Sequence, residues 1–241
     1  RVLWSKINMQ NNIIKYKIVN IKKEVDDVFT LSLFSGALLS SYIAGQVVTI
    51  FFPDINKNKG KEYSISSAPS EKGINITVKR VGVFSKLITD KKVGDILLGS
   101  LPFGYFYTES TETEMVFIAG GIGVVPFRSM IVESLKINPN RKINLFYSNK
   151  FLSGVVFKDE LDVLANKYKN IFKTHYYLTK ETVDLENIKS GRIPINDILE
   201  KSKSGKVDFF ICGSMDFVQS YHKLLYLGGV SESSIFTEEF F

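Results

Sequence analysis

The chain has 241 residues, 44% of them hydrophobic and 23% charged, which is ordinary for a globular protein long enough to build two modest domains. The net charge is +6 with lysines scattered along the chain, which favours a solvated basic surface and argues against a nucleic-acid interface. A single cysteine, Cys212, excludes an internal disulfide and a cysteine-ligated iron–sulfur cluster, and the two histidines, His175 and His222, share no ligand spacing, so no metal site is expected.

The chain carries no obvious membrane or export signal. No apolar run approaches the roughly 20 residues that span a bilayer. The segment 1–6 lacks the long apolar core of a secretory signal. These features predict a soluble, cytoplasmic protein without a transmembrane segment.

The first part of the chain alternates short apolar runs with Gly, Pro, Asn and Ser, which is typical of β-structure. An apolar helical spacing interrupts it at Phe84–Ile88, and residues 54–60 form a polar loop. Several strands at such spacing predict a small antiparallel barrel or sandwich. The expected strands are Tyr16–Val19, Val28–Phe34, Gln46–Phe52, Ile74–Arg80 and Asp95–Leu98.

The polar, acidic segment Thr108–Glu114 predicts a boundary between a domain at 1–108 and a domain at 109–241. After it, strands alternate with helices, which predicts an α/β domain with a parallel sheet and crossover helices. The expected strands are Met115–Ala119, Lys142–Tyr147, Lys173–Leu178 and Val207–Cys212. The expected helices are Pro126–Leu135, Phe157–Tyr168, Ile195–Lys201 and Phe217–Leu227.

Two motifs carry most of the chemical information. Tyr63 and Ser64, within Lys61–Ser67, place an aromatic ring beside small hydroxyls, which suits a flat polar ring such as a flavin. A core tyrosine followed by turn-forming serines would have the same sequence. The glycines of Gly120–Pro126 follow an apolar strand and open a helix, so their backbone could approach a dinucleotide phosphate. The spacing differs from G-x-G-x-x-G, and a tight turn without a ligand is the alternative.

Two shorter segments could belong to the same site. Gly82–Ser85 joins a glycine to a helix start and could offer backbone donors to a phosphate. Cys212–Ser214 ends a strand of the expected parallel sheet, at the edge where ligands of such sheets bind. The alternative for Cys212 is a small hydrophobic core residue.

Taken together, these motifs resemble those of the ferredoxin–NADP⁺ reductase superfamily, over nearly the whole chain from Ile14 to Phe241. The resemblance implies an antiparallel FAD-binding barrel followed by an α/β NAD(P)-binding domain. The matching segments, in the order of that family, are Lys61–Ser67, Val78–Arg80, Gly82–Ser85, Leu101–Gly104, Gly120–Met130, Cys212–Gly213 and Thr237–Phe240.

The resemblance also implies roles for individual residues. Tyr63 would stack on the isoalloxazine, Ser64 would lie near the flavin nitrogen that receives hydride, and Cys212 and Glu238 would border the nicotinamide; these four are the expected catalytic residues. The expected cofactor-binding residues are Lys61, Tyr63, Ser64, Ile65, Thr77, Val78, Lys79, Gly82, Val83, Phe84, Ser85, Gly120, Gly121, Ile122, Gly123, Val125, Pro126, Ser148, Asn149, Cys212, Gly213, Ser214 and Phe240.

The implied function is a flavin-dependent oxidoreductase that transfers hydride from NADH or NADPH to FAD and electrons onward to a redox partner such as a ferredoxin, a flavodoxin or another domain. The alternatives are a diaphorase that reduces free flavin, ferric chelates or quinones, and a non-catalytic flavin- or nucleotide-binding subunit. Lys61 departs from the arginine usual in the family and loses its bidentate fork. Lys150, after Ser148 and Asn149, could meet the 2′-phosphate of NADPH, but Asn149 suits a plain ribose equally well.

Overall fold

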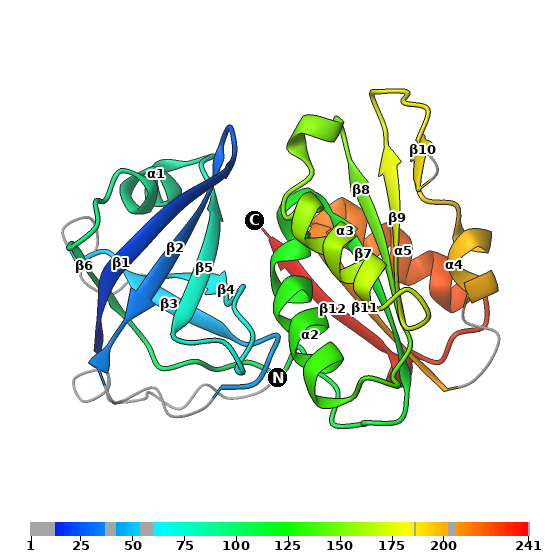
Figure 1. Ribbon diagram of the computed structural model, residues 1–241, viewed down its shortest axis with the longest axis horizontal. Coiled ribbons are helices and arrows are strands. Elements are labelled where there is room, and N and C mark those ends of the chain that lie inside the picture. The colour runs from blue at the N-terminus through cyan, green and yellow to red at the C-terminus, as the bar shows by residue number, and fades with distance from the viewer. Residues whose placement is uncertain (1–12, 37–41, 54–59, 186, 202–205, 241) are drawn as a thin grey trace.

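The structure, a computed structural model, describes residues 13–36, 42–53, 60–185, 187–201 and 206–240 (Figure 1). The start of the chain and most of the polar loop expected at 54–60 lie outside the described residues. The described chain folds around two six-stranded sheets that stand side by side (Figure 1). The C-terminal strand ends in the space between them.

The first sheet is antiparallel, with the strand order β4-β3-β6-β1-β2-β5. It closes into a barrel through a bridge between Ile65 and Ile76, just beyond β4, where Ser66 N also donates to Asn75 O at 2.8 Å. This closure buries the segment that directly follows Tyr63, residues 64–67. The elements of this barrel half are β1 (Ile14–Val25), β2 (Val28–Phe34), β3 (Val47–Phe51), β4 (Gly60–Ser64), β5 (Ile74–Lys79), α1 (Val83–Thr89) and β6 (Ile96–Gly99).

The second sheet is parallel throughout, in the order β10-β9-β8-β7-β11-β12. Alternating residues of its strands pack on α2 and α3 on one face and on α4 and α5 on the other. The elements of this parallel half are β7 (Glu114–Gly120), α2 (Val124–Ile137), β8 (Ile143–Asn149), α3 (Lys158–Lys167), β9 (Phe172–Leu178), β10 (Ile188–Ser190), α4 (Ile195–Lys201), β11 (Val207–Ser214), α5 (Met215–Leu227) and β12 (Ile235–Phe240).

The strand order reverses at β7. The chain continues from β7 to β8, β9 and β10 on one side, then returns to β11 and β12 on the other. The loops that follow β7 and β11 therefore diverge and leave a crevice at their carboxyl ends, as in other open parallel sheets. The glycine turn after β7 and Cys212–Ser214 in β11 meet there.

The two-part fold expected from the sequence is confirmed: an antiparallel barrel precedes a parallel α/β sheet. Three strands were missed. β4 is polar and shows little hydrophobic alternation, β10 has only three residues, and β12 carries two glutamates in its centre. β12 forms nevertheless because it pairs with β11 along its whole length.

A continuous apolar core joins the two halves. Ala44 and Phe106 from the barrel half are buried in the same cluster as Phe127 and Met130 of α2. The Phe106 ring meets Phe210 of β11 edge-on, with the ring centroids 5.6 Å apart. Burial of these side chains from both sides fixes how the barrel sits on the sheet.

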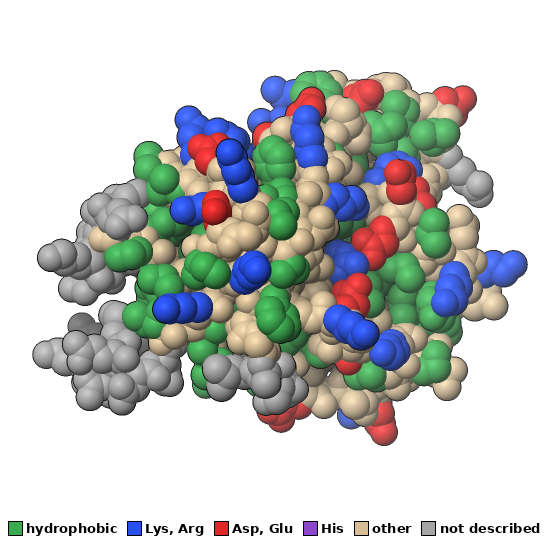
Figure 2. Space-filling model, turned by 60° about the vertical axis from the view of Figure 1, so that its left-hand side comes forward, with side chains coloured by type: hydrophobic (Ala, Val, Ile, Leu, Met, Phe, Trp, Pro, Cys, Tyr) green, Lys and Arg blue, Asp and Glu red, His purple; other side chains and the backbone are tan. Residues whose placement is uncertain are grey.

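The charges on the visible surface are mixed. Figure 2 shows Lys and Arg side chains interspersed with Asp, Glu and apolar side chains, without a continuous basic stripe on that face. Among the helices of the described residues, none is long and apolar enough to cross a membrane.

Candidate functional site

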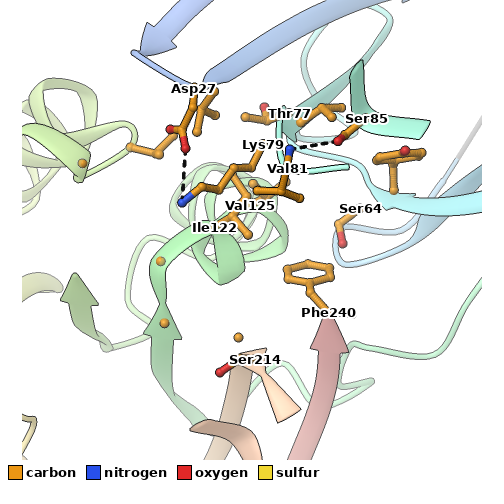
Figure 3. A pocket seen from close by; sticks show the side chains of 18 of the residues that line it. Asp27, Ser64, Thr77, Lys79, Val81, Ser85, Ile122, Val125, Ser214 and Phe240 are labelled. Carbon is orange, nitrogen blue, oxygen red and sulfur yellow. Dashed lines mark hydrogen bonds and ion pairs between the residues drawn. The ribbon is translucent and has the colours of Figure 1, made fainter. Parts of the chain in front are cut away.

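A cleft of about 1360 Å³ lies between the barrel and the carboxyl edge of the parallel sheet. It is larger than the ~300–1,000 Å³ of most single small-molecule pockets. Its walls include all four segments singled out in the sequence: Lys61–Ser64, Gly82–Ser85, Gly120–Ile122 and Gly213–Ser214. Figure 3 shows Ser64, Ile122, Ser214 and Phe240 around its centre.

The barrel wall of the cleft is built by β4. Pairing of Tyr63 with Val48 of β3 holds the tyrosine half-buried at the wall, while Ser64 is buried. Desolvation raises the pKa of Tyr63 to about 12, so its ring stays neutral and offers an apolar face with a hydroxyl at one end. This arrangement suits stacking against a flat ring.

Lys61 brings the β4 motif and α1 together. Its ammonium lies 6.0 Å from the ring centroid of Phe84, at the start of α1. Ser85, in the first turn of α1, accepts hydrogen bonds at its Oγ from two backbone N–H groups of the preceding turn: that of Val81 at 3.0 Å and that of Gly82 at 2.9 Å. The serine hydroxyl therefore shapes the turn, and the exposed cation of Lys61 is the group beside it that can meet an anion.

The floor of the cleft is the glycine turn between β7 and α2. Gly121 has φ +55°, a left-handed conformation that favours glycine, and the position where a Cβ would stand is open. Gly123 is buried: a Cβ at this position would lie 2.1 Å from the carbonyl oxygen of Cys212. The turn thus exposes Gly121 to the cleft while Gly123 lets α2 pack directly on β11.

Cys212 lies behind the cleft wall. The residue is fully buried, and its Sγ is 4.0 Å from Glu238 Oε2, because the two residues are paired between β11 and β12. Burial and the neighbouring Glu238 raise the pKa of the thiol well above its usual value, so it stays protonated. A packing role fits this site better than a nucleophilic one.

Glu238 links the two halves of the cleft. Its Oε2 accepts a hydrogen bond from Ser64 Oγ at 3.2 Å, across 174 residues of chain. Desolvation raises the carboxyl pKa to about 7, opposed by the Ser64 hydrogen bond and assisted by the charge of Glu62. The carboxyl can therefore exchange a proton near neutral pH.

The raised pKa of Glu238 predicts a pH-dependent stability. The folded state holds a proton between the usual carboxyl pKa and about 7 that the unfolded state has released, so Glu238 lowers the free energy of unfolding as the pH rises through this interval. Between pH 5 and pH 8, the melting temperature should fall further in wild type than in E238Q, whose amide cannot ionise. Equal losses in the two proteins would contradict the assigned pKa.

The far end of the cleft follows β8. Asn149 is the last residue of β8, and Lys150 begins the loop after it. This end of β8 is held against the segment that follows β9: Thr179 N donates to Asn149 O at 2.9 Å, and Leu152 N donates to Glu181 Oε2 at 2.6 Å. The Asn149 side chain interacts with the hydroxyl of Tyr147, and its buried Nδ2 makes no hydrogen bond of ordinary geometry with the described residues. Buried donors are rarely left unsatisfied, so this one fits the hydroxyl of a bound ligand.

The structure brings most of the expected site residues together. Lys61, Tyr63, Ser64, Thr77, Val78, Lys79, Gly82–Ser85, Gly120–Ile122, Val125, Ser148, Asn149, Gly213, Ser214, Glu238 and Phe240 line the cleft. Ile65, Gly123, Pro126 and Cys212 are buried just behind it. Ile65 belongs to the barrel core, Gly123 lies against Cys212 where α2 begins, and Pro126 is buried in the first turn of α2.

Sequence reasoning missed several residues that line the cleft, and Phe217 and Asp27 are two of them. Phe217 opens α5, and its ring lies so close to the glycines that a Cβ on Gly120 would be 3.0 Å from it and one on Gly213 2.9 Å. Its position just after a β-strand end was the available signal. Asp27, in the turn before β2, pairs with Lys79 at 3.4 Å on the barrel wall (Figure 3).

Comparison with known proteins agrees with this geometry. The family model described as an oxidoreductase NAD-binding domain matches residues 117–223. Flavohemoprotein B of Dictyostelium discoideum is 30% identical over 228 residues, covering 83% of this chain and 52% of that protein. The chain spans about half the length of the curated relatives it matches.

Solved structures show the same fold. The FAD/NAD-binding domain of nitric oxide dioxygenase from Vibrio cholerae superposes with a TM-score of 0.82 at 22% identity, covering 95% of this chain and 99% of that one. A ferredoxin–NADP⁺ reductase from Neisseria gonorrhoeae with bound FAD and NADP gives a TM-score of 0.81 at 22% identity, over 96% of this chain and 100% of that one.

Proposed function

This chain belongs to the ferredoxin–NADP⁺ reductase superfamily of FAD- and NAD(P)-binding proteins, and from that membership we propose that it is an NAD(P)H-dependent flavin oxidoreductase. FAD would occupy the barrel side of the cleft and the nicotinamide nucleotide the side of the parallel sheet. The observation that carries the proposal is the hydrogen bond between Ser64 and Glu238, at 3.2 Å, which joins the Tyr63–Ser64 motif of β4 to β12, the strand next to β11 in the parallel sheet.

The residues of the cleft fit both cofactors. The half-buried ring of Tyr63 would stack on the flavin, and Lys61 would neutralise its pyrophosphate as a point charge. The buried amide of Asn149, at the end of β8, would donate to the nucleotide ribose. The cleft volume, about 1360 Å³, supports two ligands rather than one.

The chemistry is divided between cofactors and protein. When bound, NAD(P)H supplies a hydride that FAD accepts and passes on as electrons. The protein holds the two rings in register and excludes water. Ser64 and Glu238 would hold a proton beside the reacting atoms, because the carboxyl pKa of about 7 lets Glu238 carry that proton near neutral pH. Cys212 would support the wall of the nicotinamide pocket.

The electron acceptor is a separate protein or domain in this proposal. Relatives of about twice the length of this chain are flavohemoproteins, and another relative belongs to a Na⁺-translocating NADH-quinone reductase of Neisseria meningitidis. Their names favour onward transfer to a second redox centre. Reduction of free flavin, ferric chelates or quinones is the second candidate.

Purified protein reconstituted with FAD should turn yellow and bleach when NADH or NADPH is added without oxygen. Parallel titrations with NADH and NADPH would give the coenzyme preference, and a panel of protein and small-molecule acceptors would restore the yellow colour at rates that identify the acceptor class. Protein that stays colourless after incubation with FAD would contradict the oxidoreductase and favour a non-catalytic subunit.

A further inference from the structure

Arg128, in the second turn of α2, crosses from the parallel half to the barrel half. Its side chain is only 11% exposed. Two N–H groups donate to Glu160 of α3, at 2.9 and 2.6 Å, and two donate to Glu71 of the barrel half, at 2.9 and 3.0 Å. The fifth bond goes to the carbonyl oxygen of Ser66 at 2.7 Å. The hydrogen-bonding capacity of a guanidinium, five N–H groups, is thus fully used.

The two arms of this network lie in different halves of the molecule. The Glu160 arm stays within the parallel half. The Glu71 and Ser66 arm reaches the segment 66–71, which continues directly from Ser64 of β4. One turn before Arg128, Val125 of the same helix lines the cleft. The Arg128 side chain therefore connects α2, which begins at the glycine turn, to the segment that continues from Tyr63 and Ser64 of β4.

The charges in this network depend on one another. Burial opposes the charge on Arg128, but its hydrogen bonds to Glu71 and Glu160 raise its pKa overall. Burial likewise raises the pKa of Glu71, but the hydrogen bonds from Arg128 and from Ala68 N hold it below its usual value. Loss of either carboxylate charge leaves a buried cation partly uncompensated, and such pairs are geometrically demanding.

Neighbouring contacts repeat the same connection. Ser129 Oγ donates to Ser67 O at 2.6 Å, and the amide of Ser70 donates to Glu133 of α2 at 2.9 Å. On the other side, the ring of Phe157 lies under the guanidinium, 5.6 Å from it. Phe157 has φ +62°, the one left-handed non-glycine residue in the described ranges, and it ends the loop that follows Asn149. Arg128 thus touches the segments that lead to both ends of the cleft.

We propose that Arg128 is a positioning residue that sets the distance between flavin and nicotinamide, through its cross-domain arm to Glu71 and Ser66. This inference rests on the proposed oxidoreductase function. Loosening the arm would let the segment 66–71 drift relative to α2. Because displacements of about 1 Å can lower a transfer rate roughly 100-fold, the rate of flavin reduction is the quantity most sensitive to it.

The test compares the two carboxylates as matched variants of the same guanidinium. E71Q weakens the cross-domain arm, and E160Q weakens the arm within the parallel half; both keep the size of the side chain. Anaerobic single-turnover mixing of the FAD-loaded proteins with NAD(P)H would separate the flavin reduction rate from the nucleotide Kd. We expect E71Q to reduce its flavin roughly 10-fold more slowly with Kd unchanged within about 2-fold, and E160Q to stay within about 2-fold of wild type.

A third variant and a second measurement keep the inference independent of activity. R128K retains the charge but loses both forks, so we expect it to behave like E71Q. In cofactor-free protein, hydrogen exchange at the Ser70 amide should quicken in E71Q and not in E160Q, because that amide is bonded across the same boundary.

Equal reduction rates in E71Q, E160Q and wild type, or equal exchange at Ser70, would overturn the positioning role. Equal losses of rate in E71Q and E160Q, with lowered melting temperatures in both, would assign Arg128 to general stability instead. If wild type itself shows no flavin reduction by NADH or NADPH, the proposed function fails, and the exchange measurement still decides whether the arm holds the two halves together.

Discussion

A Gly123→Ala variant is expected to melt on the order of 10 °C below wild type and to lose nucleotide binding. The added methyl would sit 2.1 Å from the carbonyl oxygen of Cys212 and 2.8 Å from the amide nitrogen of Gly213, both of them backbone atoms that cannot rotate away. Relieving this overlap requires α2 to separate from β11, with a cost of roughly 3 kcal/mol or more. For a chain of this length that corresponds to about 2–4 °C per kcal/mol.

Differential scanning calorimetry and nucleotide titration would measure both effects. Gly154→Ala is a suitable control, because a methyl there meets only Asn149 Oδ1, at an ordinary contact distance of 3.6 Å. We expect that variant to melt within a few degrees of wild type. A Gly123→Ala protein with unchanged melting temperature would show that α2 and β11 are not in the close contact described.

Replacing Tyr63 with alanine is expected to weaken FAD binding about 10- to 100-fold. An aromatic side chain stacked on a flat heterocycle contributes roughly 1–3 kcal/mol, and removing the ring also opens the wall of the barrel to water. The Kd for FAD, from fluorescence titration of the flavin, and the rate of its reduction by NAD(P)H would both report the change.

Two controls separate the ring from its hydroxyl and its location. Tyr63→Phe keeps the ring and should bind FAD within a few-fold of wild type. Tyr105 is 89% exposed and does not line the cleft, so Tyr105→Ala should leave FAD affinity unchanged. Unchanged affinity and unchanged reduction in Tyr63→Ala would remove the tyrosine from the flavin site.

Regular elements with strong hydrophobic patterns were predictable from the sequence. The strand Val28–Phe34 has the predicted bounds, and α2 is longer than the predicted helix by two residues at each end. Such elements can be predicted because the spacing of their apolar residues reflects which side is buried. β12 was not predictable in this way, since its glutamates break the apolar run and only its pairing with β11 makes it a strand. Its role in the site was inferred from family resemblance alone.

Most of the expected site residues line one cleft, but the interactions among them were not visible in the sequence. Ser64 and Glu238 are 174 positions apart, and nothing in their spacing indicates a contact. The same holds for Arg128 and Glu71, whose partnership depends on how α2 docks on the barrel. The roles of these residues toward FAD and NAD(P)H stay predictions until the variants are measured.

The shared core has a consequence for recombination between relatives. Ala44 and Phe106 complete the packing around Phe127 and Met130, so the second half of the chain, made alone, would present those side chains to water. A chimera that joins either half to its counterpart from a relative only about 30% identical would combine two surfaces that were never fitted to each other. An exchange between relatives should therefore move the barrel half and the parallel half together, because the cleft between them depends on this shared core.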